Sequence, residues 1–328
     1  MLASAGCTAE PVPPTGVRPA GSEEVGANAG GASGSSGSSP LDGGAGGASD
    51  AASIPSSGCG AVAPSGNVDW TVKSGGRDRT VRVHLPPGYD GKKPTPVVLA
   101  FHGRNTTAAM QELASAMTPK ADAAGFIVAY PTGVGLTWNA GLCCGQAQSE
   151  NVDDVAFTSA MLDAMESKLC VDKQRVFATG LSNGAFMANR VACELADRFA
   201  AIAPVAGQLM TLSCAASRPV AVMHFHGTAD TIVPYGGMFG LPGVEASVAA
   251  WAQRNGCKAA PAQTFAAGDT TCKTFGQCTA GADVTLCTVD GGGHQWPGGF
   301  AIPGLGKTTT DINATDAMWS FFEKHPKP

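Results

Sequence analysis

The feature that most constrains the fold of this chain is a series of short, nearly continuous apolar runs that each end in glycine. They cover residues 96–103 (PVVLAFHG), 126–133 (FIVAYPTG), 175–180 (RVFATG), 199–207 (FAAIAPVAG), 219–227 (PVAVMHFHG) and 284–291 (VTLCTVDG). Strands that are buried on both faces have this composition, and they belong to parallel sheets that helices cover on both sides. A further run, 80–86 (TVRVHLP), alternates instead and predicts an early antiparallel strand.

The stretches between these runs have the apolar spacing of helices. We predict helices at residues 108–124, 153–169, 185–195, 244–255 and 315–324. Asp153 and Asp154 begin the second of them, where carboxylates complement the helix dipole, so we expect them to act as capping residues. The alternation of strands and helices predicts βαβ units, and therefore an α/β fold with a mostly parallel central sheet.

The first 56 residues differ in composition from the rest. From about residue 8 they are mainly Gly, Ala, Ser and Pro, which bury too little apolar surface to offset the entropy of ordering. We predict a flexible linker there and a single domain over residues 57–328. The start, MLASAGC, is similar to a truncated bacterial lipoprotein signal with Cys7 as the lipid-bearing residue. The alternative is an arbitrary start before a linker.

Charge and cysteine content narrow the function classes. The formal net charge is -5 and no basic block is present, which argues against nucleic acid as a partner. No apolar run reaches the roughly eighteen residues of a membrane-spanning helix. Of the eleven cysteines, ten remain when Cys7 is set aside, and none forms a C-x-x-C pair. This favours a secreted or surface-anchored protein with disulfides over a cytosolic one with thiols, and the pairing stays open.

One serine has the sequence context of a nucleophile. Residues 180–184 read GLSNG, a G-x-S-x-G pattern between the predicted strand 175–180 and the predicted helix 185–195. In many hydrolases this pattern places the serine on a sharp strand-to-helix turn with its hydroxyl exposed. Ser182 is therefore the candidate nucleophile, and it needs a base that a third group orients.

An acid and a histidine follow in the order that such sheets require. Asp230 comes one short loop after the run 219–227, and His294 follows the run 284–291. We predict Ser182, His294 and Asp230 as a catalytic triad. Taken singly, Asp230 could cap a turn and His294 could be an ordinary loop histidine.

The oxyanion of a tetrahedral intermediate needs hydrogen-bond donors. The candidates are the backbone N–H groups of Asn183, directly after the serine, and of Arg104, at the end of the run FHGR. In place of an oxyanion site, His102 and Gly103 could form a simple strand-ending turn. No metal or organic cofactor is required by this chemistry, and we expect a monomer.

Substrate contacts are less directly indicated. Trp138 in WNAGLCCG and Trp296 in HQWPG could form flat apolar walls for an aromatic acyl group or an ester backbone, with core packing as the alternative. We include His102 among the candidate contacts. His102, His224 and His226 all lie at strand ends and also fit a structural hydrogen-bonding role.

Several segments closely resemble a known family. GLSNGAFMANRVACELADRFAAIAPVAG, HFHGTADTIVPY, NGC at 255–257 and GGGHQWPG are similar to the esterases that unite polyhydroxybutyrate depolymerases with feruloyl and acetylxylan esterases. The resemblance runs from about Cys59 to the C-terminus. It implies an α/β-hydrolase fold with Ser182, Asp230 and His294 as the triad.

Two branches of that family share features with this chain. GCG, LCVD, VACE, LSC, NGC and GQC look like the cysteine framework of secreted feruloyl esterases, whereas WNAGLCCG with NVDDVAF looks like bacterial depolymerase-like lipoproteins. We expect the four additional cysteines to form further disulfides near the active site and the histidine loop. They are Cys143, Cys144, Cys272 and Cys287.

The resemblance implies a secreted serine carboxylic ester hydrolase that acts on hydroxycinnamoyl or acetyl esters of plant polysaccharides. A polyhydroxyalkanoate depolymerase with the same triad is the second interpretation. A non-catalytic, polysaccharide-binding surface lipoprotein is the alternative from another class.

Overall fold

The computed structural model describes residues 52–328, except for 63, 65, 212, 238–239 and 241. The predicted lipid-bearing Cys7 and the predicted linker up to residue 51 lie outside the described residues. Pro55 forms a β-bridge with Asp172, and the N–H of Ser56 donates to the Val171 carbonyl at 3.0 Å. The packed chain therefore includes residues just before the expected boundary at 57.

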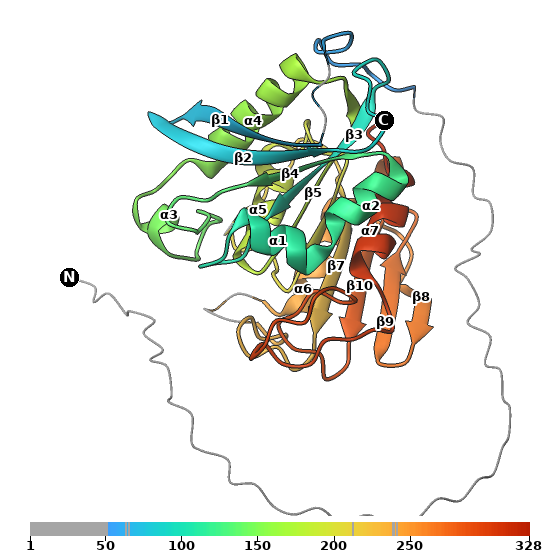
Figure 1. Ribbon diagram of the computed structural model, residues 1–328. Coiled ribbons are helices and arrows are strands. Elements are labelled where there is room, and N and C mark those ends of the chain that lie inside the picture. The colour runs from blue at the N-terminus through green and yellow to red at the C-terminus, as the bar shows by residue number, and fades with distance from the viewer. Residues whose placement is uncertain (1–51, 63, 65, 212, 238–239, 241) are drawn as a thin grey trace, which may run out of the picture. The chain divides into compact units, whose positions relative to one another are not determined.

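Ten strands form one sheet (Figure 1). They are β1 (Gly66–Ser74), β2 (Arg77–Leu85), β3 (Thr95–Phe101), β4 (Ile127–Pro131), β5 (Val171–Leu181), β6 (Ala201–Val205), β7 (Ala221–Gly227), β8 (Ala262–Ala267), β9 (Thr270–Phe275) and β10 (Val284–Val289). Their order is β1-β2-β4-β3-β5-β6-β7-β10-β9-β8. The strands from β4 to β10 in this order pair in parallel, and the antiparallel pairs lie at the two edges.

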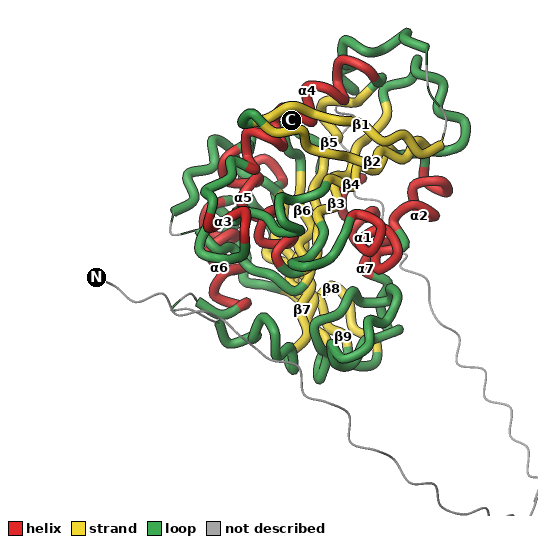
Figure 2. The backbone as a smooth tube through the Cα atoms, turned by 60° about the vertical axis from the view of Figure 1, so that its left-hand side comes forward, coloured by secondary structure: helices red, strands yellow, loops and turns green. Residues whose placement is uncertain are grey.

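Helices cover both faces of the sheet (Figures 1 and 2). They are α1 (Ala108–Ser115), α2 (Met117–Ala124), α3 (Gln146–Ser149), α4 (Asp154–Lys168), α5 (Asn183–Glu194), α6 (Val244–Arg254) and α7 (Ala314–Glu323). One core lies between the sheet and α4, α5 and α6, and the other contains residues of α2 and α7. Within β3, Leu99 belongs to the first core and Val98 to the second, which explains the continuous apolar run. Among the described residues no helix is both long and apolar enough to cross a membrane.

The predicted mostly parallel sheet is confirmed, and the differences concern the edge strands, one short helix and the bounds and division of the predicted helices. All seven predicted strands are present, but β1, β8, β9 and the short α3 were not predicted. The predicted helix 108–124 is two helices, because Ala116 adopts a left-handed conformation (φ 49°) between α1 and α2. The predicted helix 185–195 begins at Asn183, directly after the serine.

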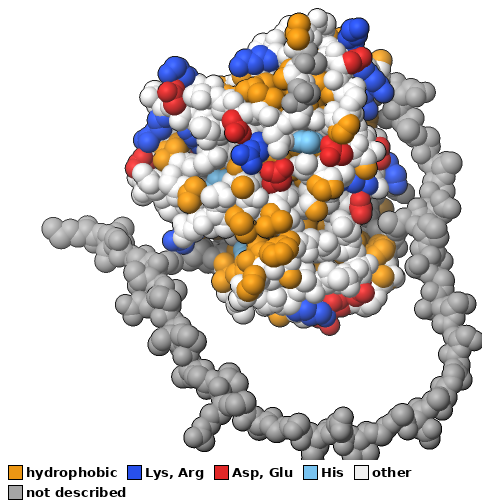
Figure 3. Space-filling view, in the orientation of Figure 1, with side chains coloured by type: hydrophobic (Ala, Val, Ile, Leu, Met, Phe, Trp, Pro, Cys, Tyr) orange, Lys and Arg blue, Asp and Glu red, His pale blue; other side chains and the backbone are white. Residues whose placement is uncertain are grey.

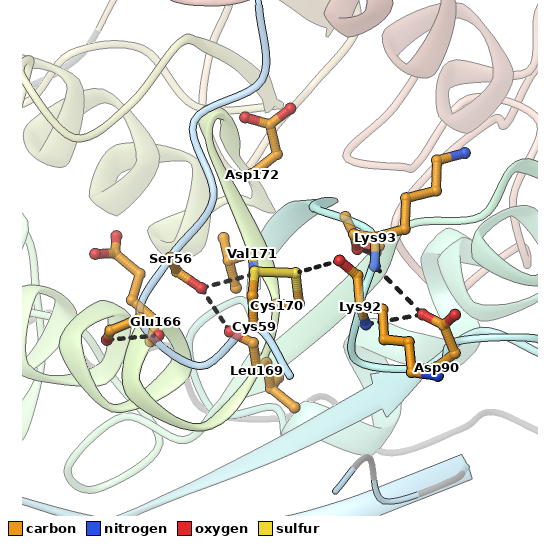
Figure 4. Close-up of a disulfide and its surroundings, with 12 residues drawn as sticks. Ser56, Cys59, Asp90, Lys92, Lys93, Glu166, Leu169, Cys170, Val171 and Asp172 are labelled. Carbon is orange, nitrogen blue, oxygen red and sulfur yellow. Dashed lines mark hydrogen bonds between the residues drawn. A yellow bond between two sulfur atoms is a disulfide. The ribbon is translucent and has the colours of Figure 1, made fainter. Parts of the chain in front are cut away.

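The ten cysteines of the described region form five disulfides. The pairs are Cys59–Cys170, Cys143–Cys144, Cys193–Cys214, Cys257–Cys278 and Cys272–Cys287. Figure 4 shows the first pair, which ties the segment before β1 to the start of β5 beside Ser56. The hydroxyl of Ser56 donates to the Leu169 carbonyl at 2.6 Å and accepts from the Val171 N–H at 2.9 Å. Hydrogen bonds and a covalent link thus fix the same junction.

The Cys59–Cys170 link is expected to contribute more stability than a short-range disulfide. It spans 111 residues, whereas Cys272–Cys287 spans 15. Replacing both members of the long-range pair by serine should lower the free energy of unfolding by about 4 to 5 kcal/mol, against about 3 kcal/mol for the short-range pair. Denaturant unfolding of the two double variants measures the difference. A larger loss in the C272S/C287S variant would contradict the expectation.

Candidate functional site

Ser182 lies on a tight turn between β5 and α5. Its backbone has φ 59° and ψ -119°, a conformation that non-glycine residues rarely adopt and that is concentrated at functional sites. A Cβ atom on Gly184 would lie 2.1 Å from the Phe101 carbonyl oxygen, and one on Gly180 would lie 2.6 Å from the backbone of Gly184. Only glycine allows the helix to start this close to β3 and β5. The half-buried Ser182 therefore has the strand, turn and helix that the sequence predicts.

Asp230 and His294 are hydrogen-bonded to each other. The Nδ1–H of His294 donates to Oδ2 of Asp230 at 2.7 Å, and both side chains are buried. Two backbone hydrogen bonds hold the loops that carry them. Ala229 N–H donates to the Gly292 carbonyl at 2.9 Å, and His294 N–H donates to the Leu305 carbonyl at 2.7 Å. The first bond joins the aspartate loop to the histidine loop, and the second holds His294 against the segment that follows it.

The order of the sheet explains why these residues meet. Asp230 follows β7 and His294 follows β10, and these two strands are parallel neighbours. Ser182 follows β5, which is separated from β7 only by β6. All three residues therefore lie beyond the C-terminal ends of parallel strands, the edge where α/β sheets place their sites. No hydrogen bond joins Ser182 Oγ to His294 within the part of the chain that the structure describes.

The Asp230 carboxylate is fully hydrogen-bonded. Its Oδ1 accepts from the N–H groups of Ile232 at 2.9 Å and Val233 at 2.8 Å. Burial alone would raise the pKa of Asp230, but hydrogen bonds from His226, His294 and the Val233 amide outweigh burial and hold this pKa below its ordinary value. Asp230 is therefore a carboxylate, able to accept from the imidazole, throughout the neutral pH range.

The two predicted oxyanion donors belong to segments that neighbour Ser182. Asn183 is the first residue of α5, where N–H groups have no partner within the helix. Arg104 lies in the turn after β3, where Asn105 N–H donates to the Leu136 carbonyl and Thr106 N–H donates to the Gly103 carbonyl. A Cβ on Gly103 would lie 3.6 Å from the Ser182 Cβ, so this turn and the serine are neighbours.

The structure contradicts the prediction that Trp138 and Trp296 form substrate walls. Trp138 is 0% and Trp296 is 1% exposed. The indole N–H of Trp138 donates to the His102 carbonyl at 2.9 Å, and that of Trp296 donates to Thr315 Oγ1 at 3.0 Å. Both rings are fully enclosed and both indole N–H groups are satisfied internally, so the alternative, core packing, applies.

His102 is likewise buried, which contradicts its prediction as a substrate contact. Its Nδ1–H donates to the Gly103 carbonyl at 2.8 Å, and its Nε2 accepts from the Gly133 N–H at 3.0 Å. Burial and the nearby Arg79 charge lower the pKa of His102, with the Gly103 hydrogen bond acting in the opposite direction. His102 therefore links the ends of β3 and β4.

The sequence did not predict the role of Asn183 and Asp154 in holding the WNAGLCCG segment. The Asn183 side chain accepts from Trp138 N–H at 2.7 Å and donates to the Trp138 carbonyl at 3.0 Å. Asp154, expected to be a cap, is instead buried, pairs with Arg79 at 2.7 Å and accepts from Asn139 N–H at 2.7 Å. Burial raises the pKa of Asp154, although Arg79 opposes the shift. The residue after the serine thus also anchors the neighbouring loop.

The additional cysteines are only partly as expected. Cys272–Cys287 joins β9 to β10, the strand that leads to the histidine loop, as predicted. Cys143 and Cys144 are bonded to each other, so they link no distant segments. Within the described residues, no three His, Cys, Asp or Glu side chains converge as metal ligands.

A family model described as "Putative esterase" matches residues 73–295 of the chain. Feruloyl esterase B of Piromyces equi is 36% identical over 234 residues, which cover 66% of this chain and 42% of that protein. The match thus spans less than half of the relative. "Putative esterase NocK" of Nocardia uniformis subsp. tsuyamanensis is 30% identical over 287 residues, 79% of this chain and 83% of that protein.

Solved structures show the same fold. An acetyl xylan esterase from Aspergillus awamori superposes with a TM-score of 0.57 over 78% of this chain and 99% of its own, at 18% sequence identity. At that identity the similarity concerns the fold alone, and it shows that the sheet and its helices have the α/β-hydrolase arrangement.

Proposed function

The chain belongs to this esterase family and is a carboxylic ester hydrolase, and on that premise we propose that Ser182, His294 and Asp230 are its catalytic triad. The observation that carries the proposal is the 2.7 Å hydrogen bond between His294 Nδ1 and Asp230 Oδ2. Because Nδ1 holds a proton for Asp230, Nε2 of the neutral ring is free to accept one.

The proposed reaction has two halves. Ser182 Oγ attacks the ester carbonyl carbon while His294 Nε2 takes the hydroxyl proton, and the imidazolium then protonates the departing alcohol. Water repeats the sequence on the acyl-enzyme, giving the free acid and restoring Ser182. Asp230 holds the imidazole in the productive tautomer and stays ionised throughout.

The oxyanion formed in each half is proposed to accept from the backbone N–H groups of Asn183 and Arg104. Asn183 N–H opens a helix, so its donor points out of α5 with the helix dipole behind it. A donor of this kind contributes roughly 3 kcal/mol to the transition state.

For the substrate we propose an ester of a hydroxycinnamic acid on a plant polysaccharide. Feruloyl esterase B supports this class. A second support is a group of exposed hydrophobic side chains on α1 and in the loop after His294, which we propose as an acyl-binding patch: Met110, Leu113 and Phe300 are 39%, 51% and 51% exposed. Phe300 N–H donates to the Ala114 carbonyl at 3.2 Å, which brings Phe300 against α1. Figure 3 shows hydrophobic side chains gathered on the face where α1 lies. Such a surface favours an acyl group with an apolar body over acetyl.

We also propose that the enzyme works outside the cytosol. Five disulfides within the described residues support an oxidising compartment, because cytosolic thiols are kept reduced.

Initial rates of the purified full chain on methyl ferulate, acetylated xylan and a 3-hydroxybutyrate oligomer test the substrate class. We expect the highest kcat/KM on methyl ferulate, by roughly tenfold or more, because the ring of the acyl group adds apolar contact that acetyl lacks. Preference for the hydroxybutyrate oligomer would instead identify a polyester depolymerase. Preference for acetylated xylan would show that the patch does not select the acyl group.

A further inference from the structure

Two buried histidines of β7 lie behind the proposed triad and have no part in the reaction described so far. His224 and His226 are 2% and 1% exposed, and their rings are stacked. Nε2 of His224 is 3.0 Å from Nδ1 of His226, and Nε2 of His226 is 2.8 Å from the Val233 carbonyl oxygen. The same Nε2 is 3.4 Å from Oδ2 of Asp230. Because the Val233 N–H donates to Asp230 Oδ1, a hydrogen-bonded series runs from His224 through His226 and Val233 to the carboxylate of the proposed triad.

The acceptors in this series fix the tautomers. A carbonyl oxygen can only accept, so Nε2 of His226 carries a proton for Val233. In a neutral His226 ring this leaves Nδ1 unprotonated, so Nε2 of His224 is the donor between the two rings. Burial, and the charge that His226 would carry, hold the pKa of His224 well below its ordinary value, which agrees with a neutral donor.

We propose that His226 is a positioning residue for Asp230, and that His224 fixes the tautomer in which His226 acts. The His226 Nε2–H holds the Val233 carbonyl, while the Val233 N–H holds Asp230 Oδ1 at 2.8 Å. The loop that carries Asp230 is therefore bound to β7 at its far end. The His226 Nε2–H also faces Asp230 Oδ2, the oxygen that accepts from His294. His226 thereby fixes the position of the Asp230 carboxylate. It also offsets part of the negative charge that Asp230 Oδ2 presents to the His294 ring.

The surroundings of His226 contain few other ionisable groups. Besides Asp230, His294 and His224, the Tyr235 ring packs edge-on at 5.8 Å. The Tyr235 hydroxyl is hydrogen-bonded to Thr288 at 3.0 Å and Glu245 at 3.4 Å, so it is turned away to other partners. A change at His226 is therefore expected to act on kinetics through Asp230.

Two substitutions of His226, by amide side chains of different length, test the proposal. In His226→Asn, the side-chain oxygen can still accept from His224, but the amide nitrogen is too short to reach Val233 and Asp230. In His226→Gln, the amide nitrogen reaches the position of Nε2. We expect H226N to lose kcat roughly ten- to hundredfold with KM little changed, because a shift of about 1 Å at a reacting group costs on the order of 10²-fold. H226Q should recover most of that loss.

The pH–rate profile gives a readout that packing alone would not move. Without the His226 donor, Asp230 Oδ2 presents more negative charge to the His294 ring, which favours the protonated, inactive form. The acid limb of kcat/KM should therefore move to higher pH in H226N and return in H226Q. Equal kinetics of the two variants, or an unshifted acid limb in folded H226N, would overturn the proposal.

His84 supplies the matched control, since it is also a buried histidine with both ring nitrogens bonded, to Asn67 at 2.8 Å and Asp122 at 2.6 Å. It lies on β2, far from β7 in the sheet order. H84N and H84Q should keep the wild-type kcat and acid limb whatever their stability. A matching change in kcat in H84N would attribute the H226N effect to general destabilisation, against the proposal.

The wild-type protein offers a test that needs no variant. In the ¹⁵N spectrum of labelled histidines at neutral pH, His226 should show a protonated Nε2 and an unprotonated Nδ1. The opposite tautomer would overturn the proposal.

The inference rests on the proposed triad, and the two can fail separately. If Ser182→Ala keeps activity, the triad is wrong, whereas an unchanged H226N beside an inactive S182A overturns only the role of His226.

Discussion

Replacing Ser182 by alanine is expected to abolish ester hydrolysis, lowering kcat/KM by on the order of 10⁴-fold or more on the best substrate. Alanine removes the hydroxyl oxygen that we propose forms the acyl-enzyme, while the proposed oxyanion donors remain. It keeps the Cβ atom and so leaves the turn, with its φ of 59°, between the same neighbours. Initial rates of the wild type and S182A measure the loss of activity, and thermal melts of the two proteins check that the fold is kept.

Ser167→Ala is the matched control, because Ser167 is an exposed serine of α4 whose hydroxyl donates only to the Ala164 carbonyl at 3.0 Å. It should keep the wild-type rate. An organophosphorus probe should label the wild type and S167A but not S182A. Turnover and labelling that persist in S182A would assign the nucleophile to another residue. A folded wild type with neither would favour the non-catalytic, polysaccharide-binding interpretation.

The central sheet could be predicted because its strands are buried on both faces. Each carries an uninterrupted apolar run, as in β3, where every residue is buried. The edge strand β8 has no such signal, because all of its residues are exposed or half-buried. A local signal was nevertheless present, since Gly268 and Asp269 alone separate β8 from β9, a two-residue connection typical of hairpins.

The proposed triad residues could be placed in the fold from the sequence more directly than the two tryptophans could. Ser182, Asp230 and His294 follow strand ends, and strand ends are visible in the apolar pattern. The apolar pattern does not show how deeply a loop residue is buried, because a tryptophan in a loop has the same sequence context whether it faces solvent or the core. Trp138 is drawn inward by contacts that are distant in sequence: its ring lies 5.2 Å from that of Phe101.

The buried role of Asp154 could not be predicted for a related reason. NVDDVAF places two acids at a helix start, where capping is the ordinary role, and Asp153 does cap α4 by accepting from Ala156 N–H at 2.8 Å. What distinguishes Asp154 is Arg79, which lies 75 residues earlier in the chain. Only the pairing of β2 with the sheet brings that partner into place.

Asp230→Asn is expected to reduce kcat/KM by about 10⁴-fold even though its shape is nearly unchanged. Oδ2 of Asp230 now accepts from His294 Nδ1 at 2.7 Å and faces His226 Nε2 at 3.4 Å. An amide nitrogen in that place would meet two donors. His294 would then shift its proton to Nε2, and the ring could no longer take a proton from Ser182. Asp163→Asn, at an exposed site of α4, is the control and should retain full activity. A loss of less than tenfold in D230N would show that His294 keeps its tautomer without the carboxylate.

The same variant is expected to change the pH dependence of stability. The pKa of Asp230 is lowered in the folded protein, so its ionised form stabilises the fold. That contribution is fully present above the unfolded-state pKa of about 4 and is lost as pH falls towards the lower folded-state value. The wild type should therefore exceed D230N in free energy of unfolding by more at pH 7 than at pH 2.5, as denaturant titrations at both pH values would show. A gap that stays constant on acidification would mean that the folded protein does not favour the Asp230 carboxylate, and the inactivity of D230N would then need a cause other than the loss of a charge that orients His294.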